Sequence, residues 1–147
     1  MSIPSRSQTL ALAPSQRDAV MALLVDRHQG DIAACTQQLW TPLAKSLVTI
    51  IGQDGFLALL DRSLHVAGEA FPWLLTSAPG AHIASRLEGL QSALAGRAAD
   101  EATQAMVLLL STFTGVLAML IGTTLSTNIL RTAWGQPFEN AVQEITK

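Results

Sequence analysis

The stretch from Ala102 to Leu130 contains no charged side chain, and it constrains the fold more than any other feature of the chain. Within it, residues 106–122 (MVLLLSTFTGVLAMLIG) are apolar on nearly every face of a helix. Such a helix has no face suited to water, so protein, lipid or another copy of the chain must surround it. The pattern therefore leaves three options: a soluble helical bundle, an oligomer and a membrane protein.

The composition favours a protein whose surface is partly buried against a partner. The chain has the length of one domain, 147 residues, of which 49% are hydrophobic and only 14% are charged. An average soluble domain has roughly a quarter of its residues charged. We therefore expect a protein partner, either a second copy of this chain or a different protein.

The basic residues and the single cysteine exclude other classes of protein. The nine basic residues are spread singly and form no cluster that could follow a phosphate backbone, so we expect no nucleic-acid binding. Cys35 excludes an intramolecular disulfide, and its apolar neighbours predict a buried, inert thiol. The N-terminal residues lack the long apolar run of a secretory signal, so the sequence predicts a cytoplasmic protein.

Apolar residues recur with helical spacing through most of the chain, and no segment alternates as a strand would. The sequence therefore predicts an all-α fold, a compact helical bundle. Capping residues, glycines and prolines predict where its helices begin and end. Helices are expected from Ser15 (with Asp18 as a capping box) to Gly30, from Asp31 to Trp40, from Thr41 and Pro42 to Gly52, from Asp54 to Phe71 before Pro72, over 83–94, from Asp100 to Gly122, from Thr123 or Thr124 to Trp134, and over 138–145.

The domain organisation is simple. Residues 1–14 contain two prolines and no sustained period, which predicts a flexible N-terminal lead-in before a single helical-bundle domain over residues 15–147. The segment 76–81 contains adjacent proline and glycine residues and is the expected hinge between two halves.

A weak internal repeat relates those halves. Aligning residues 50–64 (IIGQDGFLALLDRSL) with 120–134 (LIGTTLSTNILRTAW) pairs Gly52 with Gly122. This similarity favours two αα-hairpins related by a pseudo-twofold axis, with the other helices flanking them. Hairpins that end at glycine also look alike for local reasons, which is the alternative. After one gapped residue, the alignment pairs Phe56 with Leu125, Leu60 with Ile129 and Arg62 with Arg131.

One stripe of the uncharged helix is made of small residues, which lets a neighbouring helix approach closely. The helix from residue 104 to 122 would be about 28 Å long, enough to cross a hydrocarbon core. The hydroxyl residues in its middle and the lack of a flanking basic cluster favour a buried helix of a soluble bundle, with membrane insertion as the alternative. The small residues, which are candidates for a helix interface, are Ser111, Gly115, Ala118 and Gly122.

Three polar residues at successive i, i+4 positions, Asp61, His65 and Glu69, share one helix face and are candidate metal ligands. The alternative is an ordinary solvated stripe. Arg62 and Arg131 recur in both halves and are candidates for binding an anionic ligand, although arginines at such positions also bind helix ends or acidic neighbours.

Phe71 and Trp73 lie in an apolar segment (FPWLL) that is a candidate docking patch. The sequence shows no phosphate-binding loop, metal-binding pair or nucleophile motif, so it predicts no enzyme and no cofactor. The leading expectation is a small helical protein that acts by protein–protein association, as a homo-oligomer or as an adaptor or regulatory subunit. The alternatives are a ligand- or metal-binding bundle and a protein that inserts residues 106–122 into a membrane.

Overall fold

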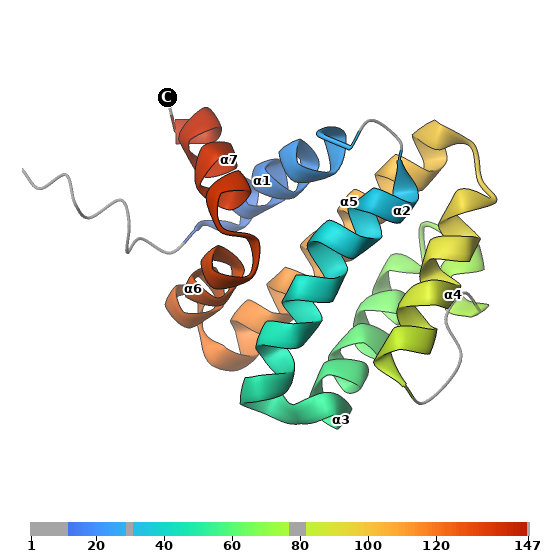
Figure 1. The fold of residues 1–147 in the computed structure, drawn as a ribbon, viewed down its shortest axis with the longest axis horizontal. Helices are drawn as coiled ribbons and strands as arrows, with labels where there is room; N and C mark the ends of the chain where they lie inside the picture. Colours follow the sequence, from blue (N-terminus) through green and yellow to red (C-terminus); the bar gives the residue numbers. More distant parts are fainter. Residues whose placement is uncertain (1–11, 29–30, 77–81, 147) are drawn as a thin grey trace, which may run out of the picture.

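The computed structural model describes residues 12–28, 31–76 and 82–146, and it confirms the all-α class because its regular elements there are all helical (Figure 1). Most of the elements pack around one shared core. In chain order they are α1 (Pro14–Asp26), α2 (Ile32–Cys35), the π-helix η2 (Thr36–Trp40), α3 (Thr41–Ala67), the 3₁₀-helix η3 (Pro72–Thr76), α4 (Ile83–Ala95), α5 (Ala99–Ile121), α6 (Thr123–Trp134) and α7 (Gln136–Thr146).

The uncharged helix, α5, lies at the centre of the fold. It packs against α1, α3, α4 and α6, which supply the apolar surroundings that its composition requires. Phe113 illustrates this packing, since its ring contacts both Trp40 and Phe56, at centroid distances of 5.1 and 5.4 Å. The middle of α5 is therefore core, whereas Met119 and Leu120 near its C-terminal end are exposed.

The expected break between the second and third helices is absent, because α2, η2 and the first part of α3 form one continuous rod. Proline within an α-helix lacks an N–H donor and clashes with the carbonyl one turn earlier. Here Pro42 directly follows a π-helical turn, in which Thr41 N–H donates to the Thr36 carbonyl. The wider turn makes room for the proline ring, so Thr41 continues a helix instead of starting one.

Glycine ends the third and sixth predicted helices where expected. Gly52 (φ 79°, ψ 168°) bends α3 sharply, and Gly122 (φ 93°, ψ 153°) separates α5 from α6. Residues with a side chain are strongly disfavoured in this region of φ/ψ space. Both bends lie at the same end of the molecule, at the lower left of Figure 1.

Several predicted boundaries differ from the observed ones. The first helix begins at Pro14, and the Gln16 side chain, which accepts a hydrogen bond from Ala13 N–H (2.9 Å), takes the capping role expected of Ser15 and Asp18. Leu12, expected in the flexible lead-in, is buried. The fourth predicted helix ends at Ala67, ahead of Phe71.

Other boundary predictions are confirmed or untested. Asp31 caps α2, its carboxylate accepting a hydrogen bond from Ala34 N–H at 3.1 Å. The predicted stop at Gly30, residues 1–11 of the lead-in and most of the 76–81 hinge lie outside the described residues.

The two halves of the chain repeat one burial pattern at a constant offset of 70 residues, without a gap. The gapped pairing of Phe56 with Leu125 was wrong, because Phe56 is fully buried whereas Leu125 is exposed. The ungapped register also extends into the first helix of each half, where Val20 matches Leu90. Further buried pairs are Ile32 with Ala102, Thr36 with Met106, Leu43 with Phe113, Leu47 with Leu117, Leu60 with Leu130 and Leu64 with Trp134.

The packing of the two halves is reciprocal. Helix α1 packs on α5, and its counterpart α4 packs on the α2–η2–α3 rod. The last elements also correspond, because α7 packs on α1 and α6 while the much shorter η3 packs on α3 and α4. Each half therefore contains three helices and a terminal element, more than the expected αα-hairpin, and the first helix of each half covers the other half.

Candidate functional site

The candidate metal ligands are not brought together. Asp61 forms an ion pair with Arg86 of α4, while His65 and Glu69 are exposed on α3 and the turn after it. Among the described residues, no three His, Cys, Asp or Glu side chains are grouped closely enough to hold a metal ion. The observed role of Asp61 is to join α3 to α4.

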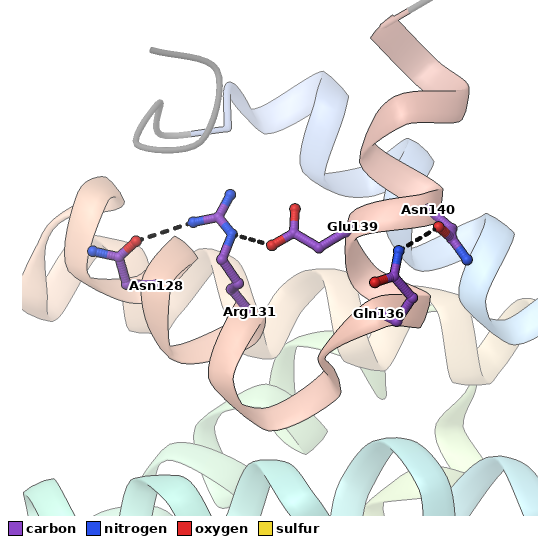
Figure 2. Close-up of polar contacts among 5 residues, drawn as sticks. All are labelled: Asn128, Arg131, Gln136, Glu139 and Asn140. Carbon is purple, nitrogen blue, oxygen red and sulfur yellow. Dashed lines mark hydrogen bonds and ion pairs between the residues drawn. The ribbon is translucent and has the colours of Figure 1, made fainter. Parts of the chain in front are cut away.

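The two candidate anion-binding arginines have different surroundings. Arg131 donates to Glu139 (2.5 Å) and to Asn128 (3.1 Å), and its guanidinium lies 5.7 Å from the Phe138 ring. Figure 2 shows these polar contacts at the joint between α6 and α7. Arg62 is exposed on α3. In the ungapped register, moreover, Asp61 matches Arg131, so the two arginines are not equivalent.

The aromatic docking candidates, Phe71 and Trp73, are engaged within the chain. Their rings pack edge to face at a centroid distance of 5.9 Å. The Trp73 indole N–H donates to Glu101 at the start of α5 (2.9 Å), and the Arg97 guanidinium lies 4.6 Å from the ring centroid. These contacts tie the turn after α3 to the beginning of α5.

The small residues of α5 also have a partner in the same chain. Helix α1 packs along them, and Arg17 Nη2 would lie 3.6 Å from a Cβ atom placed on Gly115. Ser111 and Ala118 are half-buried, whereas Gly122 is exposed at the bend. Helix α1 is thus the neighbour of α5 at the turn that holds Gly115, and the interface role expected of the small residues stays a prediction.

Large apolar side chains are exposed around the two glycine bends. Four of them define what we call the bend patch: Ile50 (51% exposed), Met119 (85%), Leu120 (69%) and Leu125 (46%). Ile50 and Leu120 are equivalent in the repeat, each two positions before its glycine. A free surface of single-domain proteins rarely concentrates such residues without a function.

At the bend patch, α6 runs antiparallel to the α2–η2–α3 rod. The Trp134 indole N–H at the end of α6 donates to the Leu39 carbonyl (2.8 Å), far from the bend. A groove of about 400 Å³ lies nearer the bend, with Ile50 on one wall and Asn128 and Ile129 of α6 on the other. Leu125, one turn earlier in α6, therefore lies on the Ile50 side of the bend.

A larger groove of about 680 Å³ separates α4 from the α2–η2–α3 rod. Its apolar wall includes Ala44, Val48 and Leu87. Polar side chains of both helices also line it: Thr36, Gln37, Thr41, Lys45, Thr49, Glu88 and Gln91. Its volume lies within the range of small-molecule sites.

Burial explains the inertness expected of Cys35. Its side chain is enclosed by the core, and this burial, with a smaller contribution from nearby Asp31, raises the pKa of the thiol from 9.0 to about 12. The thiolate, which is the nucleophilic form, is therefore scarce at neutral pH.

Sequence reasoning missed the bend patch and the larger groove. Ile50 and Leu120 were recognised as part of the repeat, but helical periodicity alone does not tell that the residues before a bend project beyond the bundle. Within the part of the chain that the structure describes, two helical runs, Ile32–Ala67 and Ala99–Ile121, have the length and composition of a membrane span, a criterion that core helices of soluble proteins also meet.

The chain matches no protein-family model, and no curated protein and no solved structure is significantly similar to it.

Proposed function

We propose that this protein functions by protein–protein association, and that a second copy of the chain binds the bend patch. The observation that carries the proposal is the grouping of Ile50, Met119, Leu120 and Leu125 around the two glycine bends. Burying such side chains against a partner removes apolar surface from water, which is the main driving force of association.

The shape of this end supports self-association. The Met119–Leu120 ridge projects beyond the bundle, and the 400 Å³ groove beside Ile50 is a recess at the same end. In an isologous dimer the same surface of both copies meets, so a ridge of one copy can enter the recess of the other, and the reverse.

The charges around the patch are compatible with this arrangement. Between Lys45 and Asp54, and again from Ala102 to Leu130, the sequence has no other charged residue. Lys45 lines the recess, and Asp54 is exposed just after the Gly52 bend. A twofold arrangement can therefore oppose Lys45 of one copy and Asp54 of the partner without like-charge repulsion.

Association accounts for the central helix better than membrane insertion does. Inserting residues 106–122 into a bilayer would require α5 to lose its contacts with α1, α3, α4 and α6. Within α5, Met119 and Leu120 are the exposed large apolar side chains that need a covering partner, whereas the large apolar residues of the preceding turns are buried or half-buried within the chain.

The proposal is tested by light scattering coupled to gel filtration, on the full chain and on Leu120→Glu. We expect the unchanged protein to elute as a dimer and Leu120→Glu to weaken dimerisation at least about tenfold, because a carboxylate would be buried without a partner. Leu75→Glu is the matched control, because Leu75 is similarly exposed (53%) but lies in η3.

Circular dichroism of both variants should show unchanged helicity, since both side chains are exposed in the isolated chain. A protein that remains monomeric, or a Leu75→Glu variant that dissociates as much as Leu120→Glu, would contradict the proposal. Sedimentation with neutral lipid vesicles separates the membrane alternative, in which the unchanged protein would pellet with the lipid.

A further inference from the structure

We propose that the groove between α4 and the α2–η2–α3 rod binds an uncharged amphiphile with an amide head and an alkyl body. This inference is argued from residues outside the bend patch, although the groove shares Lys45 and Thr49 with the recess beside Ile50. The evidence comes from one buried hydroxyl and from the arrangement of polar and apolar side chains along the groove.

The buried hydroxyl belongs to Thr36, which is 3% exposed and lines the groove, yet its Oγ1 has no hydrogen-bond partner within the described structure. Ser63 and Thr114 satisfy their buried hydroxyls locally, by donating to the Leu59 carbonyl (2.8 Å) and the Leu110 carbonyl (2.9 Å), whereas among the described residues the hydroxyl of Ser111 in α5 is unpaired like that of Thr36 but does not line this groove. A buried polar group without a partner destabilises the fold, so a ligand that supplies one gains binding free energy.

The fold does not require a hydroxyl at this position. The repeat equivalent of Thr36 is Met106, an apolar residue that is fully buried in α5. Thr36 also begins the π-helical turn, and its carbonyl accepts from Thr41 N–H. A hydroxyl with no structural partner, at a position where the matching half has an apolar residue, points to a role in binding.

The polar residues near Thr36 define the head of the ligand. Gln37 and Gln91 line the same groove, and each carries an amide with both donors and an acceptor. Because α4 runs antiparallel to the rod, the turn that holds Gln91 faces the beginning of the groove, and the turn that holds Ile83 faces its other end near Val48. A primary amide complements these donors and acceptors, and the one cation among the described lining residues, Lys45, lies nine residues further along the rod than Thr36.

The apolar wall defines the body of the ligand. Ala44, Val48 and Leu87 continue the groove away from Thr36 toward the bend. Thr36 and Val48 are 12 residues apart along the rod, which corresponds to about 18 Å of helix. An alkyl chain of eight to ten carbons fits within that length and buries its surface against this wall.

The test is a titration of the full chain with octanamide, followed by ¹H–¹⁵N NMR spectra. We expect saturable shifts of the backbone amides of Thr36, Ala44 and Leu87, and at least about tenfold weaker binding of octanoate, because Thr36, Gln37 and Gln91 bring no positive charge to a carboxylate head. Thr36→Val should weaken octanamide binding about tenfold, through the loss of one buried hydrogen bond.

The control for Thr36→Val is Thr49→Val, the same change at the other end of the groove, where the hydroxyl already donates to the Lys45 carbonyl (3.3 Å). It should bind octanamide within about twofold of the unchanged protein. The melting temperature gives a second readout, and Thr36→Val should melt at the same or a higher temperature without ligand.

Three results would overturn the proposal: no saturable shift, shifts centred on Ile50 and Leu120 instead of the groove, or a folded Thr36→Val variant that binds octanamide as the unchanged protein does.

Discussion

Gly52 and Gly122, 70 positions apart, have nearly the same unusual backbone conformation, with φ/ψ of 79°/168° and 93°/153°. Each bends the chain between the second and third helices of its half, and each is followed by a helix that returns along the bundle. The repeat therefore preserves, in each half, a backbone position at which a side chain is poorly tolerated. The bend patch is a consequence of these two bends, because the residues before each glycine project beyond the core.

Gly52→Ala and Gly122→Ala should each lower the free energy of unfolding by about 1–3 kcal/mol, because alanine is strained at these φ/ψ values. Urea denaturation measures the loss. Gly96→Ala is the control, because Gly96 has an ordinary helical conformation (φ −80°) and a Cβ there would meet only backbone oxygens at 3.7 Å. If all three variants were equally stable, the glycines would not impose the bends.

Asp61→Ala should lower the free energy of unfolding by about 1–3 kcal/mol, because it leaves the buried Arg86 side chain without its carboxylate partner. His65→Ala in α3 and Glu69→Ala in the turn after it should each change it by less than about 0.5 kcal/mol, because both side chains are exposed. Thermal unfolding with and without Zn²⁺ tests the metal alternative. If Zn²⁺ raised the unfolding temperature of the unchanged protein but not that of the three variants, the result would support the metal-site hypothesis instead.

Arg131→Ala should lower the free energy of unfolding by about 1 kcal/mol, because Arg131 joins α6 to α7 through Glu139 and the Phe138 ring (Figure 2). The loss should be smaller in high salt, which screens the ion pair. Arg62→Ala supplies the comparison and should have little effect, since Arg62 is exposed. Urea denaturation measures the free energy of unfolding of both variants. Equal losses in Arg131→Ala and Arg62→Ala would contradict the role of Arg131 in joining α6 to α7.

Cys35 should make stability depend on alkaline pH. Its thiol has a pKa raised from 9.0 to about 12 in the folded protein, so between these values the unfolded chain loses the proton while the folded chain keeps it. Its contribution to the free energy of unfolding is therefore fully present below pH 9 and is lost as the pH rises toward 12. Cys35→Ala should flatten this part of the stability profile, and an unchanged slope would contradict the assignment.

The all-α class, the glycine bends and the Asp31 cap could be predicted from sequence because each depends on local properties of the chain. The continuity of the helix through Thr41 and Pro42 could not, since capping rules treat that pair as a helix start. The π-helical turn that accommodates Pro42 becomes visible only in the folded chain.

The register of the repeat and the candidate site were also beyond local reasoning. Few residues are identical at the offset of 70, so the correct pairing of Leu60 with Leu130 appears only once burial is known. Periodicity predicted that the uncharged helix would be buried, but the neighbours that cover α5, and the end they leave exposed, depend on tertiary packing. Asp61 and Arg86 are 25 residues apart, so their pairing had no local signal.

The most direct test of association is sedimentation equilibrium of the unchanged protein over a roughly hundredfold range of concentration. The account predicts a reversible monomer–dimer equilibrium, with a mass that rises from 15.6 kDa toward twice that value as concentration increases. A single species of 15.6 kDa at every concentration would contradict it, and would leave the bend patch without the partner proposed for it.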